Sequence, residues 1–296
     1  MGPPEFESGS LAPKSIRCEE AISVDSSILD DFIGFRGING LSEEWIYLIR
    51  YYIKNYLEFV DWKLNRKETI SYFNIIRNKQ SLTSFRKQVY QIRKFLTYLD
   101  IGWAKDIKPP SEPIYLAKRI TIESIKETLS YFNDNQHYLQ IKSLMLLGIS
   151  SGMRAEELYQ LNIEDIDIGN RIIHINHNPS NGQSTKTKIS RISFFNKQTQ
   201  KTISEYLANF NNDRSLKSLF SQSHITRLFR DAPIQVKDLR KFFSQEWDRR
   251  GGPTSIKKIL MGYSLKGDVD LMHYNAQSKE DLKKIYDKVM QEDIYI

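Results

Sequence analysis

The sequence predicts a mainly α-helical protein that carries one small antiparallel β-hairpin. Apolar residues recur at steps of three and four in several stretches on both sides of a proline-rich segment, which is the spacing of amphipathic helices. Later in the chain, isoleucine-rich segments with polar alternation flank an Asn-Gly turn, which is the pattern of two paired strands. The length of 296 residues favours two domains over one.

The first domain is predicted to be helical and to cover residues 21–108. It follows a flexible tail over residues 1–20, which is rich in proline, glycine and serine. A long amphipathic helix is expected over residues 41–64, with Ser42 as its start signal and two glutamates near the positive end of its dipole. Two shorter helices are expected after it, over residues 69–78 and 81–99.

A proline-rich segment separates this domain from the rest of the chain. Lys108-Pro109-Pro110-Ser111-Glu112-Pro113 interrupts the helical pattern, which predicts a linker over residues 109–118 and a second domain over residues 119–296. The hairpin strands of this second domain are expected over residues 170–178 and 189–195. Helices are expected over residues 121–132, 138–150, 155–161, 197–210, 224–230, 236–249, 254–260 and 279–290.

The composition narrows the functional class. The net charge of +7 and the isoelectric point near 9.2 favour a polyanionic partner, with nucleic acid ahead of an anionic membrane. No stretch approaches the roughly 20 apolar residues that span a bilayer, and the N-terminus lacks the pattern of a secretory signal. Cys18 is the only cysteine, which excludes a disulfide framework and favours the cytoplasm.

The sequence also predicts a reaction without a cofactor. His174 and His177 are three residues apart on a predicted strand, so their side chains are expected to point to opposite faces. No cluster of cysteines or carboxylates accompanies them, so we expect no metal site. A glycine-rich phosphate loop that ends in Lys-Ser or Lys-Thr is also missing.

Cations and a late tyrosine recur in the second half of the chain, in an order that indicates phosphate chemistry. They are Arg154, Lys186, Lys237, Arg240 and Tyr274. Attack on a phosphodiester builds negative charge on the non-bridging oxygens, and fixed cations aimed at these oxygens lower the barrier. The planar fork of arginine can grip two oxygens and stays charged. We therefore predict that Arg154 and Arg240 bind the phosphate.

The motifs around these residues follow one another in a fixed order. Ser151-Gly152-Met153-Arg154-Ala155-Glu156-Glu157-Leu158 is similar to Thr-Gly-x-Arg-x-x-Glu-Leu, and Val236-Lys237-Asp238-Leu239-Arg240-Lys241-Phe242-Phe243 to His-x-Leu-Arg-His-x-Phe. Between them, Lys186-Thr187-Lys188-Ile189-Ser190-Arg191-Ile192 is similar to a lysine-bearing hairpin. Leu260-Met261-Gly262-Tyr263-Ser264 stands in the place of Leu-Gly-His-Ser, and Tyr274 follows it. In this order the motifs resemble the tyrosine recombinase (lambda-integrase) family.

The resemblance implies a fold, an activity and partners. The expected fold is a helical core-binding domain that clamps DNA, followed by a catalytic domain of α-helices with a small antiparallel sheet. The expected activity is site-specific recombination, in which a mobile element is integrated or excised through a 3′-phosphotyrosine intermediate. The expected partners are double-stranded DNA and further copies of the chain, as a tetramer during strand exchange. The alternatives are a type IB-like topoisomerase and a non-catalytic DNA-binding protein on the same scaffold.

The resemblance also implies the roles of the remaining residues. The hairpin lysine of the family is the general acid for the departing 5′-hydroxyl, so Lys186 takes this role, with Lys188 as the alternative. Tyr274 is the expected nucleophile, and nearby cations would favour its phenolate over a phenol whose ordinary pKa is about 10. Tyr286 is the less favoured substitute, because it falls in a predicted amphipathic helix.

Two positions depart from the pattern of the family. Lys237 stands where the family usually has histidine, and Tyr263 where it has histidine or tryptophan. A lysine can donate to phosphate but is a poorer proton shuttle near neutral pH, and a tyrosine can donate one hydrogen bond. A lysine at the histidine position is compatible with the viral or plasmid integrases of archaea.

Contacts with the DNA outside the active site are also expected. The helix over residues 81–99 has a basic side, and its predicted DNA contacts are Arg86, Lys87, Arg93 and Lys94. Lys188 in the hairpin is a further predicted contact. In the tail, Phe6-Glu7-Ser8 can be encoded by TTC-GAA-TCC, which resembles the T-loop sequence of tRNA genes and would indicate an attachment site of that origin. A cloning scar is the alternative, because the flanking residues fit common restriction sites.

Overall fold

A computed structural model describes residues 21–209, 218–264 and 277–290. The chain divides into two compact units, Met1–Leu116 and Ala117–Ile296. The tail predicted over residues 1–20 and the predicted nucleophile Tyr274 lie outside the described residues. Within the described ranges, no helix combines the length and the apolar character needed to cross a membrane.

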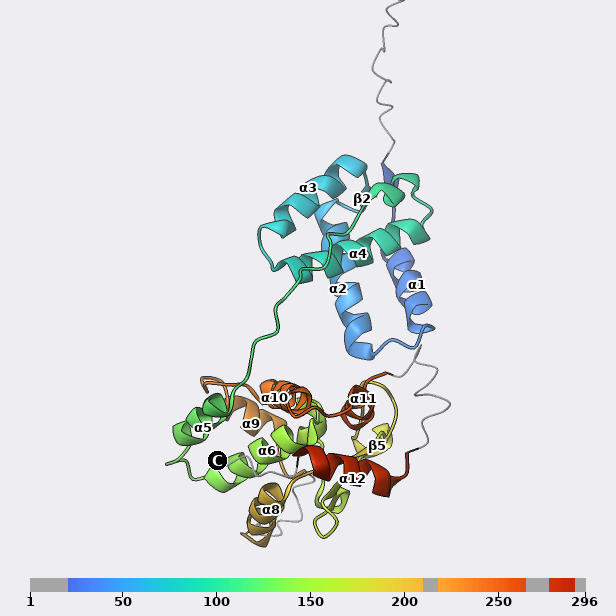
Figure 1. Cartoon of the computed structure of the whole chain (residues 1–296). Helices are drawn as coiled ribbons and strands as arrows, with labels where there is room; N and C mark the ends of the chain where they lie inside the picture. The colour runs from blue at the N-terminus through green and yellow to red at the C-terminus, as the bar shows by residue number, and fades with distance from the viewer. Residues whose placement is uncertain (1–20, 210–217, 265–276, 291–296) are drawn as a thin grey trace, which may run out of the picture. The chain divides into compact units, whose positions relative to one another are not determined.

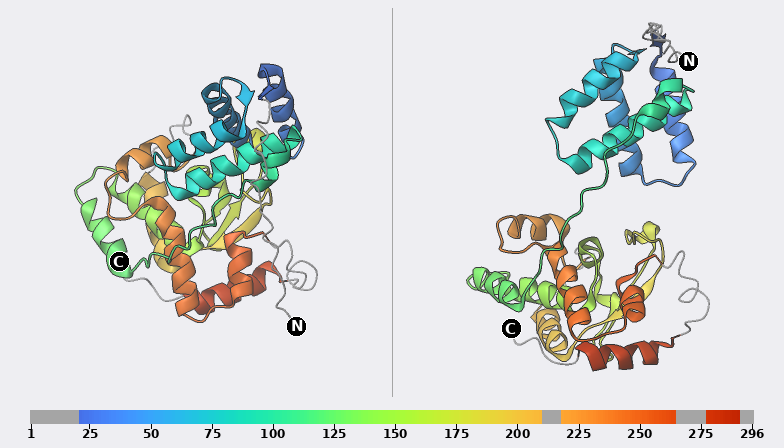
Figure 2. Two further views of the ribbon diagram at one scale, coloured as in Figure 1. Left: turned by 90° about the horizontal axis from the view of Figure 1, so that it is seen from above. Right: turned by 45° about the horizontal axis from the view of Figure 1, so that its top comes forward.

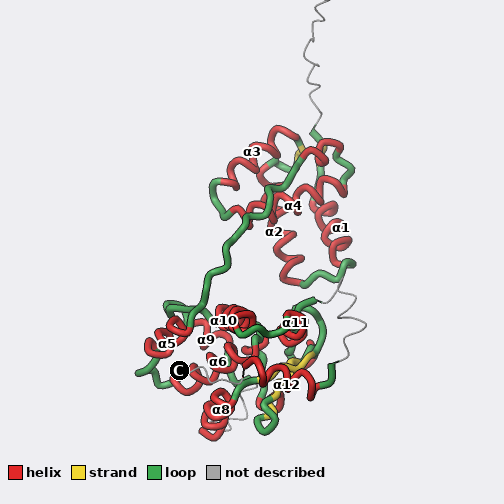
Figure 3. Tube along the Cα trace, in the orientation of Figure 1, coloured by secondary structure: helices red, strands yellow, loops and turns green. Residues whose placement is uncertain are grey.

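The first unit is a small bundle of helices (Figures 1 and 3). Helix α2 packs against α1, α3 and α4, and the short strands β1 and β2 pair beside them. Buried aliphatic and aromatic side chains from these helices form one core, as the amphipathic patterns predict. The elements are β1 (Ile22–Ser23), α1 (Ser26–Gly37), α2 (Glu43–Phe59), β2 (Lys63–Leu64), α3 (Arg66–Arg77), α4 (Leu82–Tyr98) and the 3₁₀ turn Gly102–Asp106.

Two predictions for this unit need correction. The helix expected over residues 41–64 begins after Ser42, whose hydroxyl accepts the backbone N–H of Trp45, but it ends at Phe59. It ends there because Asp61 and Trp62 adopt left-handed backbone conformations, with φ of 50° and 56°, which turn the chain into β2. Helix α1 was not predicted, because it is short and buries only a narrow apolar stripe.

The second unit is built around α6, which is almost entirely buried (Figures 1 and 2). Helix α6 packs against α7, α8 and α10, so its apolar run Leu144–Ile149 forms the centre of the core, as predicted. The helices expected over residues 236–249 and 279–290 begin and end as predicted. The helices are α5 (Ile122–Tyr131), α6 (Tyr138–Ser151), α7 (Ala155–Tyr159), α8 (Lys197–Asn209), α9 (Gln222–Leu228), α10 (Val236–Arg249), α11 (Thr254–Met261) and α12 (Lys279–Met290).

The predicted hairpin is present, and a third strand extends it. Strands β3 (Ile166–Asp167), β4 (Ile172–Ile175) and β5 (Arg191–Phe194) form an antiparallel sheet in the order β3-β4-β5. The register places Ile175 opposite Arg191. The two predicted strands are shorter than expected, and β3 was missed because two residues give no readable alternation.

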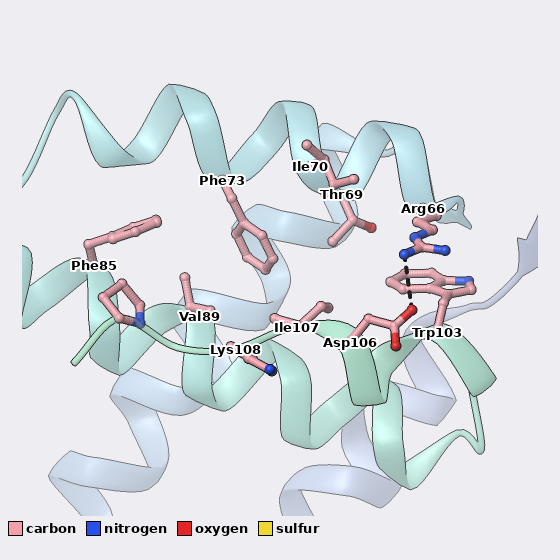
Figure 4. A pocket seen from close by; sticks show the side chains of 11 residues that line it. Arg66, Thr69, Ile70, Phe73, Phe85, Val89, Trp103, Asp106, Ile107 and Lys108 are labelled. Carbon is pink, nitrogen blue, oxygen red and sulfur yellow. Dashed lines mark hydrogen bonds and ion pairs between the residues drawn. The ribbon is translucent and has the colours of Figure 1, made fainter.

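A cavity of about 240 Å³ lies in the first unit, between α3, α4 and the segment that follows the 3₁₀ turn (Figure 4). Its lining is mainly apolar, with Phe73, Val89 and Ile107 among the contributors, and an ion pair between Arg66 and Asp106 stands at one end. None of the residues predicted to carry the chemistry lines this cavity, so the candidate site lies elsewhere.

Candidate active site

Two arginines converge on one buried carboxylate in the second unit. Glu157 lies in the first turn of α7, and its side chain is 3% exposed. Its Oε1 accepts Nη1 of Arg154 at 2.8 Å and Nη1 of Arg191 at 2.9 Å. Its Oε2 accepts the backbone N–H of Arg154 at 2.8 Å and Nη2 of Arg191 at 2.7 Å. One carboxylate thus receives four hydrogen bonds, and it fixes both guanidinium groups.

Two glycine carbonyls hold the predicted phosphate ligands. Nη2 of Arg154 donates to the carbonyl of Gly262 at 2.8 Å, and Nη1 of Arg240 donates to the carbonyl of Gly152 at 2.7 Å. Gly152 ends α6 and Gly262 ends α11, both in the left-handed conformation, with φ of 66° and 64°. The ends of two helices therefore fix Arg154 and Arg240, the pair that the sequence predicts to bind phosphate.

Gly152 is required by close packing as well as by its backbone conformation. A Cβ at this position would lie 2.5 Å from the ring of Phe243, on α10. We expect Gly152→Ala to lower the free energy of unfolding by about 2–4 kcal/mol, from left-handed strain and overpacking together. The matched control is Gly251, with φ of 71° and no atom within 4 Å of an added Cβ, where alanine should cost only about 1 kcal/mol. Denaturant unfolding measures both, and equal losses would contradict the packing argument.

The cluster carries excess positive charge in a partly buried place. Burial, and next the charge of Arg154, lower the pKa of Arg240 to about 10, against the opposing effect of Glu157. Burial alone would raise the pKa of Glu157, but hydrogen bonds and charge from Arg191, and then from Arg154, hold it below its ordinary value. Three guanidinium groups face one carboxylate, so the arrangement is suited to bind a further anion.

Tyr263 joins the cluster, directly after the glycine that ends α11. Its ring lies 5.2 Å from the guanidinium carbon of Arg240, within the range of a cation–π contact. Tyr263 is 46% exposed, so it remains accessible beside Arg240. Lys237 is exposed near the start of α10, one helical turn before Arg240 and on the same side of that helix.

The two hairpin lysines are exposed to solvent. Lys186 and Lys188 lie in the segment between β4 and β5. Lys188 has a left-handed backbone, with φ of 56°, and its N–H donates to the carbonyl of Thr185 at 3.0 Å. Neither lysine side chain has a hydrogen bond or ion pair with any residue in the described ranges. The choice between Lys186 and Lys188 stays open on this geometry.

Comparison with known proteins agrees with this geometry. The model of the phage integrase family matches residues 118–257, which include both phosphate-binding candidates and the hairpin. The chain is 27% identical to tyrosine recombinase XerA of Thermococcus kodakarensis over 154 residues, which cover 51% of this chain and 54% of that protein. It is 22% identical to XerA of Thermococcus onnurineus over 269 residues, which cover 89% and 91%. Residues 118–257 thus carry a domain of the phage integrase family.

Solved structures of tyrosine recombinases share the fold. A lambda integrase fragment, crystallised as a dimer bound to a core site, superposes with a TM-score of 0.64 at 12% identity, over 86% of this chain and 98% of that one. At this level of identity the likeness shows the fold alone. The chain spans about half the length of the first curated relative that it matches.

The structure adds two residues that the sequence analysis left without a role. Glu157 and Arg191 lie inside motifs that resemble those of the tyrosine recombinase family, but roles were predicted only for the residues expected to act on the phosphate. An acid three residues after a selected arginine, on a helix that begins there, is a signal for a local ion pair. The contact between Glu157 and Arg191, which joins α7 to β5, has no such sequence signal.

The structure also separates the late tyrosines. Tyr286 is fully buried in α12, and its hydroxyl donates to the carbonyl of Ser150 at 2.9 Å. Burial raises the pKa of Tyr286 well above its ordinary value, which disfavours the phenolate that attack requires. Tyr274 lies outside the described residues, so its role stays a prediction.

Tyr286→Phe is therefore expected to change stability and leave the chemistry intact. The variant loses one buried hydrogen bond and leaves the carbonyl of Ser150 unsatisfied, which should cost about 1–2 kcal/mol of unfolding free energy. Thermal unfolding measures that loss, and formation of a covalent adduct with nicked DNA measures the activity. A variant that unfolds like the parent, or that no longer reacts with DNA although it is folded, would contradict the assignment.

The basic side of α4 is only partly free to meet DNA. Arg86 donates to the carbonyl of Pro110 at 3.0 Å and pairs with Glu112 at 3.4 Å, so it holds the predicted linker segment against α4. Lys94 lies 4.8 Å from the ring of Tyr90. Among the other predicted DNA contacts on α4, Arg93 and Lys94 are half-buried and Lys87 is exposed. Contact of these side chains with DNA stays a prediction.

Proposed function

We propose that this chain is a site-specific DNA recombinase that cleaves and rejoins DNA through a 3′-phosphotyrosine intermediate. The observation that carries the proposal is the pair Arg154 and Arg240, which protein carbonyls and Glu157 hold beside an exposed phenol. Such preorganised cations are suited to a phosphate whose non-bridging oxygens gain charge during attack. The match of residues 118–257 to the phage integrase family supports the same activity.

The proposed reaction exchanges one ester of the scissile phosphate for another. The phenolic oxygen of Tyr274 attacks the phosphorus, the bond from phosphorus to the 5′-oxygen breaks, and the DNA 3′-end stays on the tyrosine. The phenolic proton leaves to solvent, and Lys186 gives a proton to the departing 5′-oxygen. A 5′-hydroxyl from the second DNA then reverses the step. Because one phosphodiester replaces another, rejoining needs no external source of energy.

The remaining groups support the phosphate in this proposal. Arg154 and Arg240 bind the non-bridging oxygens, Lys237 adds charge near them, and Tyr263 offers a phenolic hydrogen bond. This division gives Lys237 and Tyr263 positions around the phosphate and leaves the proton transfer to the hairpin lysine. This division of roles explains how the site could act without a histidine at position 237 or position 263.

We assign the two units different tasks in binding DNA. Residues 21–108 would form a core-binding domain, residues 109–118 the linker, and residues 119–296 the catalytic domain. Together they would clamp duplex attachment-site DNA, and strand exchange would bring four copies onto two sites in the cytoplasm of the host cell. Lysine and arginine contacts to phosphates should make this binding fall steeply with salt.

The test is a trap for the covalent intermediate. The protein is incubated with a library of duplexes that carry a nick close to the scissile phosphate. Cleavage then frees a short fragment that bears the 5′-hydroxyl, and this fragment diffuses away, so rejoining is blocked. We expect an adduct that resists detergent, is enriched for particular sequences, and disappears in Tyr274→Phe. Adduct formation without sequence preference, together with relaxation of supercoiled plasmid, would favour a topoisomerase. DNA binding without any adduct would favour a non-catalytic scaffold.

A further inference from the structure

Arg191 is the most occupied of the three arginines in the site. Its Nε donates to the carbonyl of Leu260 at 3.0 Å, and its Nη1 and Nη2 donate to the two oxygens of Glu157 at 2.9 Å and 2.7 Å. Its side chain is 8% exposed. Each of its three nitrogens already has an acceptor inside the protein, so Arg191 is not placed to bind the scissile phosphate.

The ion pair with Arg191 changes what Glu157 does to Arg154. A carboxylate that is 3% exposed and paired with Arg154 alone would cancel the charge that Arg154 offers to a phosphate. Arg191 instead takes one hydrogen bond on each oxygen of Glu157, in the bidentate geometry that suits arginine. The carboxylate therefore stays ionised and orients Arg154, while Arg154, Arg191 and Glu157 together keep one net positive charge.

Arg191 also fixes the end of α11. Its guanidinium lies against Gly262, where an added Cβ would be 2.7 Å from Cζ of Arg191. The carbonyl of Leu260 accepts from Arg191, and the carbonyl of Gly262 accepts from Arg154. The next residue, Tyr263, places its ring beside Arg240. One side chain on β5 thus ties the sheet to the turn that positions the other groups.

We propose that Arg191 is a positioning residue for DNA cleavage: it balances the charge of Glu157 and fixes the end of α11, so that Arg154 stays cationic and correctly placed at the phosphate. The proposal rests on the proposed function. It predicts that the charge of Glu157 becomes harmful when Arg191 is absent, because the carboxylate then neutralises Arg154. Removal of both charges should restore part of the activity.

The test compares Arg191→Gln with the double variant Glu157→Gln/Arg191→Gln. We expect Arg191→Gln to lower the single-turnover rate of adduct formation by about 100-fold, as a small misplacement of a reacting group does. The Kd for the same DNA, measured by titration, should change by less than about 2-fold, since the Arg191 side chain is 8% exposed and its nitrogens already have acceptors in the protein. The double variant should react at least about 10-fold faster than the single variant, because Arg154 is no longer neutralised.

Arg171→Gln is the matched control. Arg171 is also an ion-paired arginine of this unit, with a side chain that is 13% exposed and lies 2.8 Å from Asp287, and it also donates to a carbonyl, that of Phe195. Its loss should lower the thermal midpoint and leave the rate of the folded protein unchanged. A role of Arg191 in stability alone would make the Arg171 and Arg191 variants behave alike, and would give no recovery in the double variant.

Arg191→Lys keeps the proposal testable if Arg191→Gln does not fold. Lysine retains the charge but cannot donate to both carboxylate oxygens and to Leu260 in one plane. We expect a rate about 10-fold below the parent with unchanged DNA affinity. A folded Arg191→Lys or Arg191→Gln that reacts at the parent rate overturns the proposal, as does a double variant no faster than Arg191→Gln. A parent protein that forms no adduct on any DNA counts against the proposed function itself.

Discussion

Replacement of Arg240 with alanine is expected to lower the rate of DNA cleavage by about 100- to 1,000-fold, the cost of removing one preorganised donor from a developing oxyanion. Arg240 is held by the carbonyl of Gly152 and lies under the ring of Tyr263, so few alternative conformations are open to it. Burial and the neighbouring Arg154 lower its pKa to about 10, which still leaves it charged at neutral pH. A bound phosphate would offset the repulsion between the positive charges of Arg240 and Arg154.

The substrate provides the sharpest control for Arg240. A methylphosphonate at the scissile position replaces one charged non-bridging oxygen with a methyl group, so less charge needs stabilisation. The difference in rate between Arg240→Ala and the parent should shrink by at least about 10-fold on this substrate. Arg240→Lys, which keeps the charge and loses the fork, should fall between the two proteins on the natural phosphodiester. An equal loss on both substrates would mean that Arg240 acts on folding or DNA binding.

Replacement of Lys186 with alanine is expected to lower the cleavage rate by about 100- to 10,000-fold, the range for loss of a general acid. In the structure Lys186 is exposed and unpaired with any described residue, so the loss of its side chain should leave the fold intact. Lys188 provides the matched control, because it is also exposed and lies two residues away. The assay is single-turnover adduct formation on nicked DNA.

A leaving group that needs no proton distinguishes the general acid from a simple phosphate ligand. When sulfur replaces the bridging 5′-oxygen, the departing thiolate is stable without protonation, so a variant that lacks the acid should cleave this DNA nearly as fast as the parent. Rescue of Lys186→Ala with unchanged Lys188→Ala would assign the role to Lys186. The reverse pattern would assign it to Lys188, and no rescue of either would remove both from proton transfer.

Local patterns predicted much of the fold. The helices at residues 236–249 and 279–290 were predicted with their observed bounds, because their apolar stripes repeat regularly between clear ends. The helix α1 was missed because its buried stripe is narrow, and β3 because it has two residues. The end of α2 depends on two consecutive residues with positive φ, neither of which is glycine.

The same contrast holds within the site. Arg154 and Arg240 were found because phosphate chemistry needs arginine and because their motifs follow in order. The pairing of Glu157 with Arg191 joins residues 34 positions apart, on α7 and β5, and only the tertiary fold brings them together. In the same way, Arg86 has the charge of a DNA contact, but its acceptor lies in the linker segment at Pro110. Such roles depend on tertiary contacts that spacing alone does not encode.

The most direct measurement is to identify the residue that carries the DNA after the covalent complex is trapped. Trypsin divides the late tyrosines among different peptides: residues 259–266 contain Tyr263, residues 267–279 contain Tyr274, and residues 285–288 contain Tyr286. After digestion of the protein and the DNA, tandem mass spectrometry should find the residual nucleotide on Tyr274 in the peptide of residues 267–279. A nucleotide on Tyr263, on Tyr286 or on any other residue would contradict the proposed mechanism.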